Sequence, residues 1–313
     1  VHETRARALV NATGPWAARF LDEQVQAPGR RTLRLVKGSH IVVPRLFDHE
    51  HAYIFQNPDR SIIFAIPYES DFTLIGTTDV EHHGGLDAVA VDAGEVDYLC
   101  TQASRYFSRP LAAADVVWSY SGVRPLLDDE SGDPSAVTRD YELELDAPPG
   151  GAPLLTLWGG KITTFRKLAE ESADLLAPAL RGAGGPWTRD AHLPGGELGG
   201  EAGPGAHPDA RFQGLLDSLA VRHPDWPQPL RHRLARCYGS RIGMLLGADG
   251  LGPQVVPGLH EAELDYLHAH EWARTAEDVL WRRTKLGLHL GPQERRAVQA
   301  WCEEHWEGCL QGM

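Results

Sequence analysis

The segment from Leu157 to Arg166 constrains the fold of this chain more than any other stretch. It reads Leu-Trp-Gly-Gly-Lys-Ile-Thr-Thr-Phe-Arg, and an apolar strand precedes its two glycines. Apolar residues then recur at three- and four-residue spacing from Ile162 to Leu176, which predicts a helix. Because glycine has no Cβ, a ligand can approach the backbone closely at this turn. The helix N-terminus and Lys161 add positive potential, so the segment predicts a seat for an anionic or electron-rich group.

The same segment also fits an ordinary turn with a solvated lysine, and in either case Thr163 or Thr164 is expected to cap the helix. Two further runs favour a functional interpretation: Val-Asn-Ala-Thr-Gly-Pro-Trp at residues 10–16 and Ser-Gly-Val-Arg-Pro at residues 121–125. The first predicts a second strand, a turn of small residues and a helix that begins at Pro15, where proline is tolerated. Taken alone, this turn fits packing as well as cofactor binding.

In this order, the three runs resemble the FAD-dependent glycerol-3-phosphate dehydrogenases, which belong to a larger flavoprotein group with D-amino-acid and glycine oxidases. Further runs fit the same family: Lys-Gly-Ser-His-Ile-Val-Val-Pro at 37–44, Ile-Gly-Thr-Thr-Asp at 75–79 and Glu-Asp-Val-Leu-Trp-Arg-Arg-Thr at 277–284. The resemblance covers nearly the whole chain. It implies oxidation of sn-glycerol 3-phosphate to dihydroxyacetone phosphate, with electrons passed to a quinone or another acceptor.

The predicted fold is α/β plus α. From Thr32 to Leu74 the apolar residues alternate, which indicates an antiparallel sheet inserted into the α/β part. Residues 92–107 have helical spacing, and residues 116–120 read as a strand that returns to the α/β part. We therefore expect part of a Rossmann-like FAD-binding domain (1–30 and 120–181), an inserted antiparallel β substrate domain (31–119), a glycine- and proline-rich linker (182–205) and an all-α C-terminal domain (206–313).

The resemblance implies FAD as the cofactor and assigns contacts with it to the two turns. The expected cofactor-binding residues are Ala12, Thr13, Gly14, Trp16, Gly159, Gly160, Lys161, Ile162 and Thr163. Lys161 and the start of the helix at Ile162 are expected near the pyrimidine edge of the flavin. There they would stabilise negative charge on the reduced ring.

Two arginines are candidate substrate ligands. Arg124 stands within a Gly-Val-Arg-Pro run, and its guanidinium offers a planar fork to an oxyanion or carboxylate. Arg139 could simply pair with Asp140 or Asp129 at the surface. The resemblance implies that both arginines reach the substrate, with Arg139 at its phosphate and Arg124 at its glycerol hydroxyls and reacting carbon. An acidic protein needs such local cations, here together with Lys161, to hold a phosphate ester.

His40 is the candidate proton acceptor. It lies between Gly38-Ser39 and an apolar run, so we expect it at the start of a strand, facing a cleft. A lone histidine there also fits a structural role, but the resemblance places it at the substrate pocket. Its ordinary pKa near 6.5 suits a general base at neutral pH. The alternative is that an arginine-stabilised alkoxide loses its proton to water. The expected catalytic residues are thus His40, Arg124 and Lys161.

Residues 75–79 end a strand with turn-forming residues. We expect them to form a capped loop or, alternatively, to line the cleft.

Composition excludes some classes of function. The formal net charge of −13 argues against nucleic-acid binding, which needs a basic surface. Four cysteines without paired spacing favour a reducing compartment, and 15 scattered histidines form no metal-ligand pattern. We expect a cytoplasmic protein, since no apolar run is long enough to span a bilayer and no signal peptide is visible. The resemblance adds peripheral association with the inner face of the cytoplasmic membrane.

Three interpretations stay open on sequence alone. The chain begins with Val1 and contains no G-x-G-x-x-G fingerprint after a strand, so we expect the C-terminal part of a longer enzyme, inactive without its N-terminal part. A related flavin-dependent amine or amino-acid oxidase would use Arg124 for a carboxylate. In a third interpretation, the chain is a non-catalytic interaction module.

Overall fold

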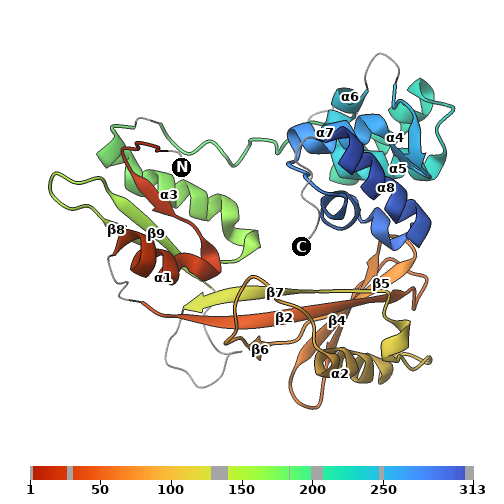
Figure 1. Cartoon of the computed structure of the whole chain (residues 1–313), viewed down its shortest axis with the longest axis horizontal. Coiled ribbons are helices and arrows are strands. Elements are labelled where there is room, and N and C mark those ends of the chain that lie inside the picture. Colours follow the sequence, from red (N-terminus) through yellow and green to blue (C-terminus); the bar gives the residue numbers. More distant parts are fainter. Residues whose placement is uncertain are drawn as a thin grey trace. The chain divides into compact units, whose positions relative to one another are not determined.

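The computed structural model describes residues 3–26, 31–127, 140–182, 184–198, 207–246 and 250–306. They belong to two compact units, Val1–Arg189 and Asp190–Met313 (Figure 1). The first unit contains two sheets and the second is mostly helical. The finer division of the chain into four parts stays a prediction.

The smaller sheet of the first unit has the strand order β1-β9-β8. β1 (Leu9–Asn11) runs parallel to β9 (Leu154–Gly159), and β8 (Tyr141–Asp146) pairs with β9 in the antiparallel sense. Three consecutive helical segments follow β1: the 3₁₀ turn η1 (Gly14–Trp16), the α-helix α1 (Ala17–Phe20) and the π-helical turn η2 (Leu21–Val25). Trp158 is fully buried against this stretch, and its indole nitrogen donates to Glu144 Oε2 over 3.0 Å.

The larger sheet is antiparallel and has six strands in the order β3-β4-β5-β2-β6, with β7 also paired to β2. Its strands are β2 (Leu33–Pro44), β3 (Tyr53–Gln56), β4 (Ile62–Tyr68), β5 (Phe72–Gly76), β6 (Val80–Glu81) and β7 (Trp118–Leu127). The β2–β7 ladder is the longest and extends from Leu33–Leu127 to Val42–Trp118. The strand predicted at 116–120 begins at Trp118 and continues to Leu127, and it pairs with β2 along this whole length.

Helix α2 (Ala93–Ser104) covers one face of the larger sheet, as the spacing of residues 92–107 predicts (Figure 1). Its N-terminus is a capping box, in which Asp92 and Glu95 each accept from the other's backbone amide. Apolar side chains of the helix and of alternate strand residues form the core beneath it: Ile41, Val43, Ile63, Ala65, Ile75, Leu99, Cys100, Ala103 and Leu111. We call this side the rear face of the sheet and the opposite side the front face. A 3₁₀ turn η3 (Ala113–Asp115) leads from the helix to β7.

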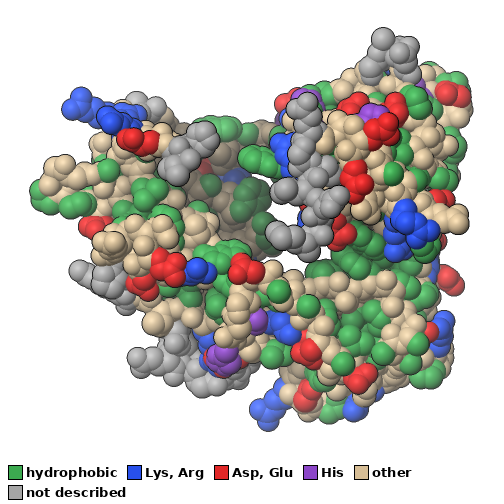
Figure 2. All heavy atoms as spheres, viewed as in Figure 1, with side chains coloured by type: hydrophobic (Ala, Val, Ile, Leu, Met, Phe, Trp, Pro, Cys, Tyr) green, Lys and Arg blue, Asp and Glu red, His purple; other side chains and the backbone are tan. Residues whose placement is uncertain are grey.

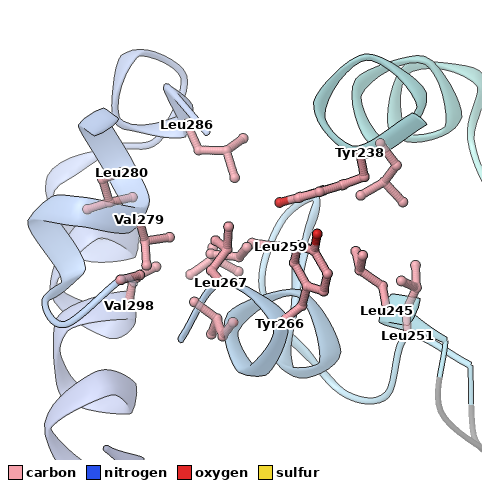
Figure 3. Packing of buried hydrophobic residues seen from close by; sticks show 14 of the residues in the cluster. Tyr238, Leu245, Leu251, Leu259, Tyr266, Leu267, Val279, Leu280, Leu286 and Val298 are labelled. Carbon is pink, nitrogen blue, oxygen red and sulfur yellow. The ribbon is translucent and has the colours of Figure 1, made fainter. Parts of the chain in front are cut away.

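Helices build the second unit around a single large apolar core, part of which Figure 3 shows. They are α4 (Pro208–Arg222), α5 (Gln228–Tyr238), α6 (Ile242–Leu245), α7 (Glu261–His270), α8 (Pro292–His305), the 3₁₀ turns η5 (Gly239–Arg241) and η7 (Leu286–Leu288), and the π-helical turn η6 (Asp278–Arg283). One short hairpin, β10 (Gln254–Val256) with β11 (Leu259–His260), is an addition to the predicted all-α domain. The partly buried Arg233 forms a two-pronged ion pair with the buried Glu263, at 2.6 and 2.7 Å.

The surface is mixed in charge. On the face that Figure 2 shows, acidic and basic side chains of the described residues are interspersed, in keeping with an acidic chain. Within the described ranges, none of the helices combines the length and the apolar character that crossing a membrane requires.

Candidate functional site

His40 and Arg124 lie on the front face of the larger sheet. In the β2–β7 ladder Val36 pairs with Arg124, Gly38 with Gly122, and His40 with Tyr120. Directly paired residues point to the same side of a sheet, and residues two apart in a strand do so too. The two side chains therefore flank the Gly38–Gly122 pair. His40 lies well inside β2 and not at its start, which corrects the expectation from sequence.

The guanidinium of Arg124 is held in place from one side. It forms an ion pair with Asp79 through Nη1, and Nη2 donates to Thr77 Oγ1 over 3.2 Å. A Cβ at Gly38 would lie 2.6 Å from Nη2, so glycine is required for the guanidinium to lie across this strand. Thr77 and Asp79 thus line the site, which was the second of the two interpretations of that run.

The imidazole of His40 lies over Gly76 and against Tyr120. A Cβ at Gly76 would overlap the ring, and the Tyr120 ring stacks on it with 5.0 Å between centroids and 7° between planes. Burial lowers the pKa of His40, and the positive charge of Arg124 lowers it further. Its Nδ1 atom is buried and has no hydrogen-bond partner among the described residues. The ring is therefore neutral at neutral pH and can accept a proton.

Gly122 leaves a space between these two side chains. A Cβ built there would meet no atom within 4 Å. Arg124 borders the space on one side, and Tyr120 with its stacked His40 borders it on the other. The front face therefore offers a small open site with a fixed cation and a neutral imidazole at its edges.

The two predicted cofactor turns lie at one edge of the smaller sheet. Residues 12–14 follow β1 and residues 159–161 end β9, and these strands are parallel, so their carboxyl ends point the same way. Gly14, Gly159 and Gly160 all have positive φ angles, of 58°, 70° and 102°. The first turn is fixed by Asn11, whose side chain donates to Ala17 O and accepts from Thr13 Oγ1.

A helical segment follows the second turn, as predicted, with Thr164 at the N-cap position of its α-helical part. It begins with the 3₁₀ turn η4 (Ile162–Thr164) and continues as α3 (Phe165–Leu180). Thr164 occupies the N-cap position of α3, but its side chain makes no capping hydrogen bond, because Oγ1 donates back to Lys161 O over 3.0 Å. Lys161 is exposed, as is Ile162 with 85% of its surface accessible. Both side chains are thus free to contact a ligand at this edge.

The strand that carries Arg124 connects the two sheets. β7 packs against β9 and η1 as well as pairing with β2. A Cβ at Gly159 would lie 3.6 Å from Pro125 O and 3.0 Å from Asp140 O. Pro125, the residue next to Arg124, is therefore in contact with the second predicted cofactor turn. Arg139, predicted to bind phosphate, falls outside the described residues.

Several residues at this site were not singled out as site residues from the sequence. They are Thr77, Asp79, Tyr120 and the glycines Gly38, Gly76 and Gly122, which make room for Arg124 and His40 or leave the site open. In the sequence, the glycines at 38 and 122 and the Thr-Thr-Asp run at 77–79 were the features that could have pointed to these residues. Only the strand register shows that they belong to one surface.

Comparison with known proteins gives consistent results for both units. Residues 1–166 match the family described as FAD dependent oxidoreductase, and residues 187–304 match the C-terminal domain of alpha-glycerophosphate oxidase. The chain is 48% identical to a glycerol-3-phosphate dehydrogenase of Pseudomonas aeruginosa, over 97% of this chain and 59% of that protein. It is 47% identical to a D-erythritol 1-phosphate dehydrogenase of Brucella abortus, over 95% of this chain and 58% of that protein.

A solved structure shows the same fold. It is the glycerol-3-phosphate dehydrogenase from Bacillus halodurans complexed with FAD, with a TM-score of 0.78 and 29% identity over 97% of this chain. The match covers 59% of that protein. The chain thus spans less than two thirds of the relatives that it matches.

Proposed function

Since the chain belongs to the FAD-dependent oxidoreductase family, we propose that the protein containing it oxidises sn-glycerol 3-phosphate to dihydroxyacetone phosphate. The observation that carries this proposal is the placement of His40 and Arg124 on either side of the open space at Gly122. Both halves of the chain match proteins that act on glycerol phosphate by name, which supports a phosphate ester as the substrate.

The edge that carries the two turns fits a flavin dinucleotide. Gly14 has a positive φ and leaves open space at the backbone of the first turn, since a Cβ there would meet no atom within 4 Å, and Gly159 and Gly160 allow the second turn its positive φ angles. The second turn leads into a helix N-terminus, which favours negative charge. The residues that would hold FAD are Ala12, Thr13, Gly14, Trp16, Gly159, Gly160, Lys161, Ile162 and Thr163. Lys161 and the helix N-terminus would stabilise the negative charge of its reduced ring.

The chemistry assigned to the chain's own side chains is a coupled loss of a proton and a hydride from the secondary alcohol. The neutral imidazole of His40 takes the hydroxyl proton and becomes an imidazolium ion. Arg124 stabilises the oxygen as it acquires negative charge, and the carbonyl forms as hydride leaves the carbon. FAD, when bound, accepts that hydride with its two electrons.

The remaining assignments concern the binding of the substrate phosphate, the electron acceptor and the location of the protein. Arg139 binds the substrate phosphate, so that the reacting carbon is held in place by a group remote from it. Electrons leave to a quinone or another acceptor. The protein works in the cytoplasm, with peripheral association at the inner face of the membrane when the acceptor is a quinone.

A second substrate competes with the first. The relative named D-erythritol 1-phosphate dehydrogenase is as similar to this chain as those named for glycerol 3-phosphate. Both substrates are polyol phosphates, so the same cations can bind either. The front face around Gly122 would then decide the length of polyol accepted.

The test uses the protein expressed from its complete reading frame. FAD bleaching is measured without oxygen after mixing with glycerol 3-phosphate, D-erythritol 1-phosphate, glycine or D-alanine. We expect glycerol 3-phosphate to give the highest second-order rate constant. A higher value for D-erythritol 1-phosphate would change the substrate within the same class. Bleaching only by amino acids would contradict the proposal, and failure to retain FAD would favour a non-catalytic interaction module.

A further inference from the structure

The rear face of the larger sheet contains a buried carboxylate that the proposed chemistry does not use. Glu95, in the first turn of α2, is 5% exposed. Its Oε1 atom accepts from Ser39 Oγ and from Thr78 Oγ1, each over 2.8 Å. Its Oε2 atom accepts from the Asp92 amide over 3.1 Å and pairs with Lys37 Nζ at 2.8 Å. Every side of the carboxylate is thus partnered, as a buried charge requires.

These contacts fix the position of Thr78. Its hydroxyl donates to Glu95 and accepts from the backbone amide of Ser39 over 3.0 Å. The Thr78 amide donates in turn to Ser39 O over 3.4 Å. Thr78 is therefore tied both to helix α2 and to strand β2. It is 5% exposed, so solvent does not replace these bonds.

Thr78 stands between the two residues that hold Arg124 on the opposite face. Asp79 forms the ion pair with Arg124, and Thr77 Oγ1 accepts from its Nη2 atom. Thr77 Oγ1 also donates to Thr78 O over 3.0 Å, which leaves its lone pairs directed to the guanidinium. A continuous set of hydrogen bonds thus runs from Glu95 through this loop to Arg124.

We propose that Glu95 is a positioning residue for Arg124, because it anchors Thr78 from the rear face and so holds Thr77 and Asp79 against the guanidinium on the front face. The role deepens the proposed function, on which it rests for the substrate that Arg124 contacts. Glu95 touches neither substrate nor cofactor in this scheme. Its effect reaches the reaction through the orientation of one cation.

The substitution that tests the link is Glu95→Gln. Glutamine keeps the size of the side chain, but its NH₂ group is a donor. In the wild-type protein all four partners of the Glu95 carboxylate donate: the Ser39 and Thr78 hydroxyls to Oε1, and the Asp92 amide and the Lys37 ammonium to Oε2. In either orientation the NH₂ group would therefore face two donors. We expect kcat/KM for glycerol 3-phosphate to fall about tenfold in the complete protein. In an Arg124→Lys background the same substitution should change kcat/KM by less than about twofold, because coupled residues are not additive.

A second readout does not depend on the substrate. The pKa of His40 is followed by NMR of isotopically labelled histidine, and the His40 signal is assigned with a His40→Asn variant. Around this ring stand Tyr120, stacked on it, and Arg124, whose charge lowers its pKa. When Arg124 is released in Glu95→Gln, the pKa of His40 should rise. If glycerol 3-phosphate proves not to be the substrate, this shift still decides whether Glu95 positions Arg124.

Ser104→Ala is the matched control. Ser104 is on the same helix, and its hydroxyl accepts from the Leu111 amide and donates to Cys100 O, away from Arg124. Its loss should lower Tm and leave both kcat/KM and the pKa of His40 unchanged. If Glu95→Gln behaves in this way too, the proposal is wrong.

Thr78→Val and Thr78→Ser keep the test decisive should Glu95→Gln fail to fold. Valine removes the hydroxyl that joins Glu95 to the loop, and serine retains it. We expect Thr78→Val to reproduce the rise in the pKa of His40 and Thr78→Ser to restore the wild-type value. Equal values in the two variants would overturn the proposal.

Discussion

The two faces of the larger sheet differ in how fully their polar groups are partnered. On the rear face, both oxygens of Glu95 are hydrogen-bonded and apolar side chains pack beneath α2. On the front face, His40 Nδ1 is buried without a hydrogen-bond partner in the described part of the chain, and Gly122 borders open space. An unpaired buried polar atom is unfavourable unless a ligand or water satisfies it.

The same strands build both faces. Ile41 follows His40 in β2, yet it faces the core under α2, because successive side chains of a strand alternate. The rear face therefore supplies stability, and the front face leaves open the space at Gly122 between Arg124 and His40. Changing one face at a time should separate loss of activity from loss of stability.

The largest effect is expected from His40→Asn on the front face. Removal of the proton acceptor should lower kcat by about 10²–10⁴-fold. The fold should persist, because the substitution removes only one stacking contact with Tyr120 and no hydrogen bond through Nδ1. Stopped-flow flavin reduction measures the rate, and the exposed His51→Asn variant serves as control. An unchanged rate would assign the proton to water instead.

The corresponding change on the rear face is Ile41→Ala. Ile41 is completely buried, so the truncation should lower the free energy of unfolding by about 2–5 kcal/mol. Urea unfolding measures this loss. Activity per folded molecule should stay close to wild type. A selective loss of activity with little change in stability would remove the distinction between the faces.

A smaller effect is expected from Arg124→Lys. Lysine keeps the charge but cannot bind Asp79 and Thr77 with the planar fork of arginine. The KM for glycerol 3-phosphate should rise about tenfold, equivalent to about 1.4 kcal/mol. Arg109→Lys is the control, since Arg109 pairs with Asp115 at the surface and should have no effect on KM. An unchanged KM in both variants would separate Arg124 from substrate binding.

The smallest expected effect is a pH dependence of stability. Because the pKa of His40 is lower in the folded than in the unfolded protein, the unfolded state binds more protons as pH falls. The contribution of His40 to stability is complete above the unfolded pKa near 6.5 and is lost as pH falls through this value toward the folded pKa. Urea unfolding at about pH 7.5 and about pH 5.5 should therefore show a larger decrease for wild type than for His40→Asn. Equal decreases would mean that burial of His40 is not linked to folding.

Much of the fold is predictable because it depends on local pattern. The alternation of residues 33–43 predicts a strand, and the glycines at 159 and 160 predict a turn before a helix. Asp92 followed by Glu95 marks the start of α2, and Thr275 with Asp278 marks another helical turn. Each of these features depends on residues that are close together in the sequence, so the sequence alone is sufficient to predict it.

The arrangement of the site depends on contacts between distant residues. Which face of β2 carries His40 is decided by where α2 packs, and pairing of Arg124 with Asp79 depends on strand register. Glu95 has the sequence signature of an ordinary capping residue, and its bonds to Ser39 and Thr78 arise only in the folded sheet. Thr164 stands at the predicted N-cap position, but its side chain makes no capping hydrogen bond because it bonds locally to Lys161 O.

The most direct test of the front face as the substrate site is a crystal structure of the complete protein with glycerol 3-phosphate. The substrate should lie over Gly122, with a hydroxyl oxygen within hydrogen-bonding distance of Arg124 and of the His40 ring. Binding at another surface, with this space left to solvent, would contradict the assignment of His40 and Arg124 to the reaction.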